Sequence, residues 1–170
     1  MPGRILGPKD GDVGMLTAIG VRFMVSSEES GGGFSLVEHP IPPRALGAPL
    51  HRHHREDEYS FVLEGRVGAI LEGQVSYAGP GDLILKPRGE WHTFWNAGDE
   101  PARILEIISP AGFEGYFREM VKLPEDATPA DRSAIAKRYH LEVDTASIPT
   151  LVREHGLQFG TRPSTPTNLR

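Results

Sequence analysis

The stretch from Pro49 to Ser109 most constrains the fold, because glycines divide it into a series of short apolar runs. Each run has the length and composition of a β-strand. Many short strands at this spacing are typical of a β-sandwich or a β-barrel, and the spacing alone does not choose between the two. The expected strands cover residues 50–54, 58–63, 66–71, 74–77, 82–86, 91–95 and 102–109.

The segment before this stretch is less regular. Residues 1–12 are rich in glycine, proline and aspartate and are expected to form an arm, followed by strand candidates at 14–19, 21–26 and 34–38. The three adjacent glycines 31–33 are expected to form a hairpin loop, because no Lys-Ser/Thr pair or helical pattern follows them as in a phosphate-binding loop. Four prolines are expected to prevent regular strand pairing before residue 50, namely Pro40, Pro42, Pro43 and Pro49.

After Pro110 the pattern becomes helical. Apolar residues from Phe113 to Val121 repeat at the spacing of one helix face, and Pro124 ends this helix. Thr128 is a favourable N-cap, followed by a proline and then an acidic residue at the third position, which predicts a helix to about residue 139. A third short helix is expected over 148–155, closed by a glycine. We expect these helices to pack outside the strands.

Composition excludes several classes of protein. The 170 residues carry a net charge of −5, and the basic residues are scattered, which argues against a nucleic-acid-binding surface. Cysteine is absent, so disulfides, thiolate metal sites and a cysteine nucleophile are excluded. We find neither the apolar core of a signal peptide nor a run near the roughly 20 apolar residues of a membrane span. A cytoplasmic location is the expectation.

Three of the seven histidines lie within four residues, at His51, His53 and His54, and acidic residues follow at once. In an extended strand His51 and His53 point to the same side, and two imidazoles on one wall are the beginning of a metal site. His54 has the opposite parity and is expected to lie outside the site. The carboxylate ligand is open at this point, because Asp57 keeps the alternation whereas Glu58 requires a bulge or a turn.

Two motifs in the chain resemble those of the cupin superfamily. The first cupin motif is G(X)5HXH(X)3-4E(X)6G, and it is matched by His51, His53, Glu58 and Gly65, although Gly47 lies only four residues before His51. The second is G(X)5PXG(X)2H(X)3N. It is matched at every spacing by Gly81, Pro87, Gly89, His92 and Asn96.

The resemblance implies a mainly β fold, a double-stranded β-helix or jelly-roll barrel with C-terminal α-helices. The cupin domain, with its N-terminal arm, is expected to span residues 1–110. Residues 111–160 are then a helical extension packed on the barrel, and 161–170 a flexible tail.

The resemblance also implies one divalent transition metal, namely iron, manganese, nickel, cobalt, copper or zinc, with open positions for substrate. Its ligands would be His51, His53, Glu58 and His92, because the distance to Gly65 favours Glu58 over Asp57. An apolar substrate pocket is expected where Phe94 faces inward with Ser60, Val62 and Leu85. The remaining histidines are expected to be surface or core residues, namely His39, His140 and His155.

In function the chain resembles the small single-domain cupins described as quercetin 2,3-dioxygenase-like. This implies a metal-dependent dioxygenase acting on an aromatic or enediol-type small molecule, with Glu58 as the general base. One alternative is a metal-dependent isomerase or lyase of a sugar or keto acid, which would need a cation such as Lys86, Arg88 or Arg103 for the anionic group. Another is a non-catalytic small-molecule-binding protein. Cupins commonly pair, so a homodimer through sheet edges and residues 1–26 is expected.

Overall fold

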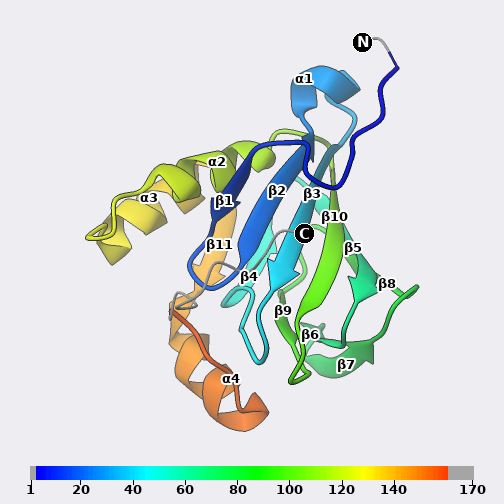
Figure 1. Ribbon diagram of the computed structural model, residues 1–170. Coiled ribbons are helices and arrows are strands. Elements are labelled where there is room, and N and C mark those ends of the chain that lie inside the picture. Colours follow the sequence, from blue (N-terminus) through cyan, green and yellow to red (C-terminus); the bar gives the residue numbers. More distant parts are fainter. Residues whose placement is uncertain (1–2, 161–170) are drawn as a thin grey trace.

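The computed structural model describes residues 3–160, and within them the expected strands form two antiparallel sheets that face each other (Figure 1). The larger sheet has the order β1-β2-β3-β10-β5-β8 and consists of Val13–Met15 (β1), Gly20–Val25 (β2), Ser35–Ile41 (β3), Ala102–Ser109 (β10), Asp57–Glu64 (β5) and Leu83–Lys86 (β8). The smaller sheet has the order β11-β4-β9-β6-β7 and consists of Leu141–Asp144 (β11), Leu50–His53 (β4), His92–Asn96 (β9), Val67–Leu71 (β6) and Gln74–Ala78 (β7). The predicted mainly β fold is confirmed.

Apolar side chains from both sheets fill the space between them. Val62 and Ile104 of the larger sheet pack with Ala69 and Phe94 of the smaller one, and all are buried. Each residue of a strand that points inward is followed by one that points outward, so the inward residues of the two sheets form the core between them. All seven runs predicted between Pro49 and Ser109 form strands, and no predicted bound differs from the observed one by more than one residue.

One expectation about the prolines is wrong. Strand β3 continues through Pro40, which pairs with Arg103 of β10, to Ile41. A proline removes only the hydrogen bond of its own nitrogen, and the end of a strand tolerates that loss. The longer β3 carries His39 to an inward position, where it is buried.

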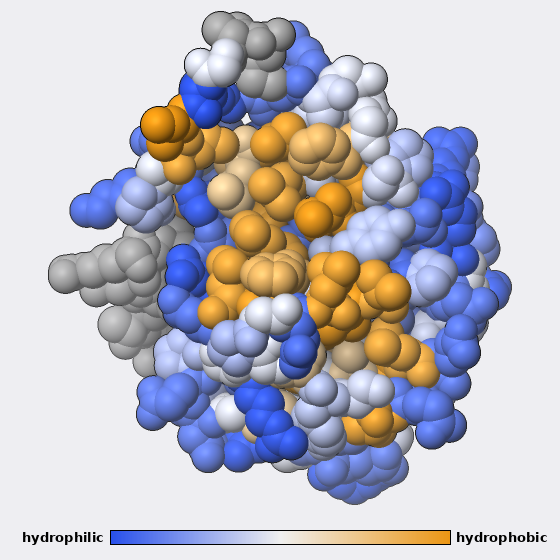
Figure 2. Space-filling view, turned by 90° about the vertical axis from the view of Figure 1, so that its right-hand side faces the viewer, coloured by the Kyte–Doolittle hydropathy of each residue, from blue (hydrophilic) through white to orange (hydrophobic). Residues whose placement is uncertain are grey.

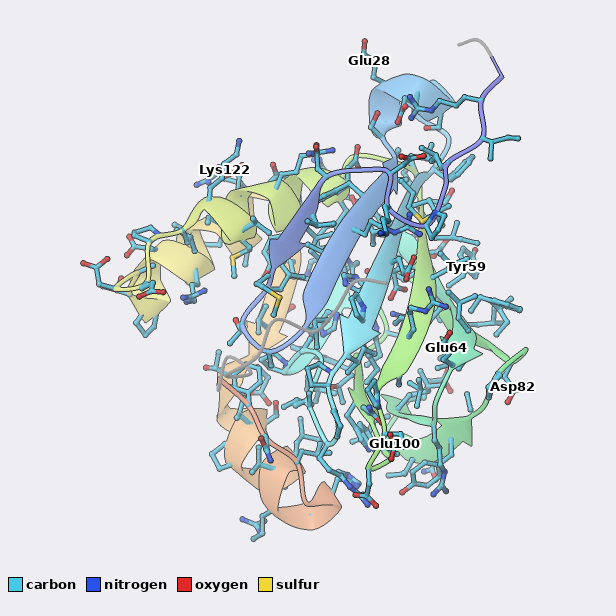
Figure 3. All side chains as sticks on the ribbon, in the orientation of Figure 1. Glu28, Tyr59, Glu64, Asp82, Glu100 and Lys122 are labelled. Carbon is cyan, nitrogen blue, oxygen red and sulfur yellow. The ribbon has the colours of Figure 1, made fainter. Side chains whose placement is uncertain are left out.

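Leu85 was expected in the pocket, and this is also wrong. Leu85 pairs with Tyr59, whereas its neighbour Ile84 pairs with Ser60, so Ile84 faces the core and Leu85 the outer side. Leu85 is 55% exposed. Figure 3 shows Tyr59 on this outer face of β5, and apolar side chains gather on the side of the molecule seen in Figure 2. The exposed apolar residues of β5 and β8 are Phe61, Leu83 and Leu85.

The helices begin and end where local signals predict. α2 (Glu114–Lys122) carries the expected apolar stripe, and α3 (Pro129–Arg138) begins at Thr128, whose hydroxyl accepts from the Asp131 amide in a capping box. α4 (Ile148–His155) ends at Gly156, which has a left-handed φ of 62°. A one-turn helix, α1 (Ser27–Ser30), precedes the glycine loop.

The helices cover two regions of the sheets. Phe117 of α2 and Ala136 of α3 pack with Phe23 and Val37 of the larger sheet, and α2 and α3 lie beside β1 and β11 in Figure 1. Leu151 of α4 packs near Trp95 of the smaller sheet. None of the helices within residues 3–160 combines the length and apolar character that a membrane crossing needs.

The C-terminal extension also contributes a strand that the sequence analysis did not predict. β11 follows α3 and pairs along the whole of β4, with Leu141 opposite His53 and Val143 opposite His51. A short 3-10 helix, η1 (Thr145–Ser147), then leads into α4. The extension therefore supports the strand that carries two of the candidate ligands. The predicted flexible tail at 161–170 lies outside the described residues.

Candidate metal centre

Two neighbouring strands bring the three predicted histidine ligands together. His51 and His53 alternate inward on β4, and His51 pairs with His92 of β9. The imidazole centroids lie 4.3 Å apart for His51 and His92 and 5.3 Å apart for His51 and His53. All three side chains are buried. His54 points outward instead, where it lies 3.3 Å from a carboxylate oxygen of Glu142.

The carboxylate that joins these histidines is Glu58, not Asp57. Residues 54–56 form a turn between β4 and β5, and this shift in parity turns Glu58 inward. Glu58 is buried, while Asp57 binds the side chain and the backbone amide of Arg88 on the outside. One ligand atom from each of four buried side chains lies within 4.8 Å of the others, namely His51, His53, Glu58 and His92.

The hydrogen bonds of these histidines suit a metal ion. Nδ1 of His51 lies 2.8 Å from the Pro49 carbonyl and Nδ1 of His92 lies 3.1 Å from that of Glu90. Because a carbonyl only accepts, both Nδ1 atoms donate, and in the neutral rings each Nε2 carries the lone pair that a metal would bind. Nε2 of His92 points into the cluster, 3.3 Å from Glu58 Oε2. Neither ring nitrogen of the buried His53 has a hydrogen-bond partner among the described residues. Three imidazoles and a carboxylate are a donor set that divalent transition metals accept.

Burial favours the neutral forms of His51 and His92 in the absence of metal. It lowers the pKa of His51 well below its usual value and also lowers that of His92, and in both cases burial is the largest cause. Burial by itself would raise the pKa of Glu58, but nearby His53 and Lys86 hold it well below the usual range. Neutral imidazoles beside an ionised carboxylate are the protonation states that metal binding requires.

A buried ion-pair network supports Glu58 from behind. Lys86 is fully buried, and its Nζ lies 3.0 Å from Glu58 Oε2 and 2.8 Å from Glu106 Oε1. The hydroxyl of Ser60 donates to the Glu106 carboxylate at 3.0 Å. Burial raises the pKa of Glu106 to about 7. Lys86 therefore fixes one oxygen of the candidate ligand and neutralises part of the negative charge around it.

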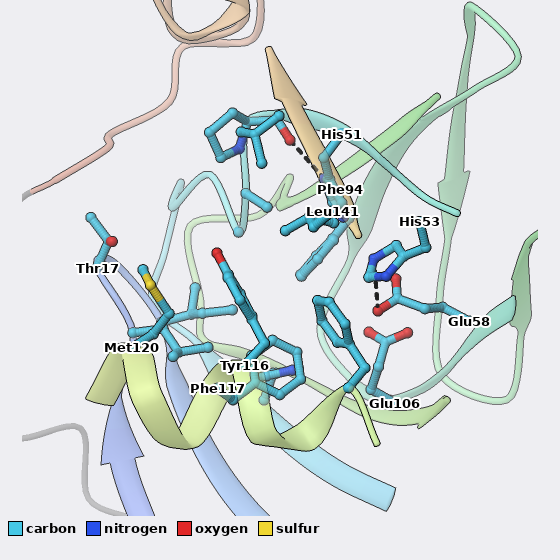
Figure 4. Close-up of a pocket in the computed structure, with 18 of the residues that line it drawn as sticks. Thr17, His51, His53, Glu58, Phe94, Glu106, Tyr116, Phe117, Met120 and Leu141 are labelled. Carbon is cyan, nitrogen blue, oxygen red and sulfur yellow. Dashed lines mark hydrogen bonds and ion pairs between the residues drawn. The ribbon is translucent and has the colours of Figure 1, made fainter. Parts of the chain in front are cut away.

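A cavity opens beside the cluster (Figure 4). Its walls include the ligands His51, His53 and Glu58, and Phe94 from β9 lines it as predicted. Ser60 and Val62 are buried but do not line it, because Ser60 binds Glu106 and Val62 belongs to the core between the sheets. Further lining residues come from the segment between β1 and β2 (Leu16, Thr17, Ile19), from β3 and β10 (His39, Glu106), from the segment before β4 (Gly47, Ala48, Pro49), and from the C-terminal extension (Phe113, Tyr116, Phe117, Met120, Leu141, Val143, Phe159).

Gly47 lies out of register with the cupin motif, and the structure explains why this residue is a glycine. A Cβ at Gly47 would lie 2.4 Å from the Phe94 ring, so only glycine lets this ring lie where it lines the cavity.

Sequence reasoning did not place three polar residues near the site: it named Lys86 only as a cation for an anionic substrate and His39 only as a surface or core residue, and it did not single out Glu106. Each occupies an inward position of a strand, between apolar inward residues at i−2 or i+2. Val37 and Ile41 flank His39, Ile84 precedes Lys86, and Ile104 and Ile108 flank Glu106. A polar residue within such an alternating apolar series is the signal that could have found them.

The buried His39 predicts how stability depends on pH. Burial lowers the pKa of His39 to about 4, whereas a histidine in the unfolded chain titrates near 6.5. Between these values the unfolded state binds more protons, so the free energy of unfolding falls as the pH falls from 6.5 to 4, by up to about 3 kcal/mol from this residue. His51 and His92 act in the same direction in metal-free protein.

Urea unfolding of metal-free protein at pH 7 and pH 5 measures this loss. The difference should shrink in His39→Gln and stay unchanged in His54→Gln, because His54 is exposed. An undiminished pH dependence in His39→Gln would show that His39 is protonated in the folded state.

The fold and the four inward donors define a class of protein. Two antiparallel sheets face each other and hold three histidines and one glutamate beside a largely apolar cavity. The two sequence motifs predicted this arrangement. The family model described as Cupin domain matches residues 38–108, a segment that contains all four donors. This match confirms the predicted resemblance of residues 38–108 to the cupin family.

Two other proteins are each similar to a short segment of this chain. The oxidoreductase iacF of Pestalotiopsis fici is 42% identical over 50 residues, which are 29% of this chain and 24% of iacF. The polyketide synthase CurC of Streptomyces cyaneus is 33% identical over 60 residues, or 35% of this chain and 39% of CurC. Both matches thus span well under half of the relative.

Among solved structures, the cupin domain of Schizosaccharomyces pombe Cnp3 superposes with a TM-score of 0.55 at 16% identity. The superposition covers 68% of this chain and 82% of that domain. At this identity the likeness concerns the fold.

Proposed function

We propose that this protein is a metal-dependent dioxygenase that acts on a small aromatic or enediol-type molecule. The observation that carries the proposal is the position of the four-donor cluster at the wall of a cavity lined mostly by apolar and aromatic side chains. The likeness of a short segment to an oxidoreductase, iacF, supports the same reaction class. A divalent metal held by His51, His53, Glu58 and His92 would supply Lewis acidity at the substrate oxygen.

The surroundings of the cluster argue against an anionic substrate. No lysine or arginine within residues 3–160 lines the cavity. Of the three candidate cations, Lys86 is held between Glu58 and Glu106, Arg88 binds Asp57, and Arg103 contacts Glu38 and Glu64. A sugar phosphate or keto acid would find no cationic side chain in the cavity and could meet its charge only at the metal, whereas an aromatic ring fits the walls.

The network behind Glu58 bears on its expected role as the base. The ion pair with Lys86 stabilises the ionised carboxylate and holds the pKa of Glu58 low. A carboxylate held in this way is a good metal ligand and a weak proton acceptor. We therefore propose that Glu58 acts mainly as a metal ligand. It would accept a proton only from a substrate hydroxyl whose pKa the metal has already lowered.

Oxygen consumption separates the candidate reactions. Tag-free protein reconstituted with iron, manganese, nickel, cobalt, copper or zinc would be screened in an oxygen electrode with catechols, flavonols and β-diketones. A dioxygenase consumes one O2 per substrate and places both atoms of labelled oxygen in the product. The His92→Ala variant should be inactive, and His54→Ala should retain activity, because His54 lies outside the cluster.

Two outcomes would favour the alternatives. Turnover that continues at the same rate without oxygen would identify an isomerase or lyase and contradict the dioxygenase. Tight ligand binding without any turnover would identify a non-catalytic binding protein. We also propose a homodimer, which light scattering on purified protein would test.

A further inference from the structure

The cavity has a second polar region besides the metal-binding cluster. It lies on the wall formed by β3 and α2, where His39 and Tyr116 are among the lining residues. The ring of His39 meets Phe117 of α2 edge-on, with 5.2 Å between the centroids. The established role of this cavity wall in the fold is apolar packing, so two polar groups there need an explanation.

His39 presents a hydrogen-bond acceptor. Its side chain is buried at 2% exposure, and Nδ1 lies 2.8 Å from the Gly20 carbonyl. Nδ1 must donate to that carbonyl, so in the neutral ring Nε2 carries the lone pair. The described residues supply no hydrogen bond to Nε2. Burial holds the ring neutral at ordinary pH, with its pKa lowered to about 4.

Tyr116 presents a hydroxyl. Figure 4 shows its side chain reaching from α2 into the cavity, with the oxygen at the far end. No residue within 3–160 forms a hydrogen bond with this hydroxyl, and burial raises its pKa to about 12, so it stays protonated. The side chain is half-buried, so in the free protein water can satisfy this hydroxyl, and a ligand oxygen that accepts its hydrogen bond can replace that water.

We propose that His39 and Tyr116 are two polar contacts of this cavity, each of which binds a neutral hydroxyl group of the substrate, while another substrate oxygen faces the four-donor cluster. The inference rests on the proposed function only in assigning the substrate to this cavity. A substrate hydroxyl can donate to the His39 lone pair, and a substrate oxygen can accept from the Tyr116 hydroxyl, whereas a carboxylate or phosphate would face the His39 lone pair with no proton to donate. The substrate class is therefore a neutral diol or an equivalent enol with two separated oxygens.

The size of the cavity further restricts which substrates can bind. About 100 Å³ of it is open to the centres of water molecules. This is the order of the ~150 Å³ apolar cavity that accepts benzene in another protein. One ring fits such a space, whereas a three-ring flavonol would extend beyond it. We infer a single-ring or similarly compact substrate.

Matched pairs of small phenols test the two polar contacts. Resorcinol is compared with 3-methylphenol and hydroquinone with 4-methylphenol, because each pair differs only by a hydroxyl in place of a methyl group. Binding is measured by titration calorimetry on the full chain, both metal-free and metal-loaded. We expect at least one dihydroxy compound to bind about tenfold more tightly than its methyl partner.

Three variants assign that preference to the two residues. His39→Asn keeps a donor for the Gly20 carbonyl but removes the Nε2 acceptor, and Tyr116→Phe removes only the hydroxyl. Each should reduce the preference to about twofold or less. The control is His155→Asn, because His155 stacks on Trp95 and does not line the cavity. It should leave the preference unchanged.

The readouts keep this proposal separate from the metal centre. Loss of metal binding with an intact hydroxyl preference in metal-free protein would overturn the proposed function and support the two polar contacts. Bound metal with no preference in either pair would overturn the two polar contacts. So would a preference that survives both His39→Asn and Tyr116→Phe. Tyr116→Phe keeps the test decisive if His39→Asn does not fold.

Discussion

Replacing Lys86 with methionine is expected to lower the free energy of unfolding by about 3 kcal/mol or more. The substitution keeps most of the side-chain volume but removes the only ammonium that the structure places between Glu58 and Glu106 within residues 3–160. Two carboxylates would then be buried without a cation, and one must be protonated for the protein to fold. Urea unfolding of metal-free protein at pH 7 measures the loss.

The surface pair Arg88–Asp57 provides the matched control. Arg88→Met removes a cation whose side chain is about half exposed, and exposed ion pairs contribute about 1 kcal/mol or less. The double variant Lys86→Met with Glu106→Gln should recover part of the loss, because it removes a charge together with its partner. Equal, small losses for Lys86→Met and Arg88→Met would contradict a buried ion-pair network behind Glu58.

The second large effect concerns metal content. Protein expressed without added metal, and purified without a histidine tag, is expected to contain about one equivalent of a transition metal, and His53→Ala is expected to bind it more than about 100-fold more weakly. His53 is buried in the cluster, and neither of its ring nitrogens forms a hydrogen bond within the described residues. Elemental analysis, followed by titration of metal-free protein, measures both quantities.

His54→Ala controls for the histidine-rich stretch itself. His54 is the next residue along the chain, but its side chain is exposed and contacts Glu142. Metal content should therefore be unchanged. Equal losses in His53→Ala and His54→Ala would mean that the metal binds to the surface of the stretch.

The ligands could be predicted because their signals are local. Alternation alone places His51 and His53 on one face and His54 on the other, and the structure agrees. Alternation fails at the carboxylate, since the turn at 54–56 reverses the parity and brings in Glu58 instead of Asp57. The family spacing identified Glu58 correctly because it reflects that turn.

The errors have a common cause in strand parity. Leu85 is apolar and was placed inside, but the register with β5 turns Ile84 and Lys86 inward and Leu85 outward. A lysine at an inward position is stable only with partners from other strands. The partners of Lys86, Glu58 and Glu106, lie on β5 and β10, so the sequence of β8 alone could not predict them. β11 was missed for a related reason, since four residues between helices pair only because β4 presents a free edge.

A crystal structure of the metal-loaded protein, with anomalous data collected at the absorption edge of the bound metal, tests the central claim most directly. We predict one strong anomalous peak within about 2.0–2.2 Å of four ligand atoms. These are one imidazole nitrogen each of His51, His53 and His92 and one carboxylate oxygen of Glu58. A loaded crystal whose peak lies elsewhere, for example between His54 and Glu142, would contradict it.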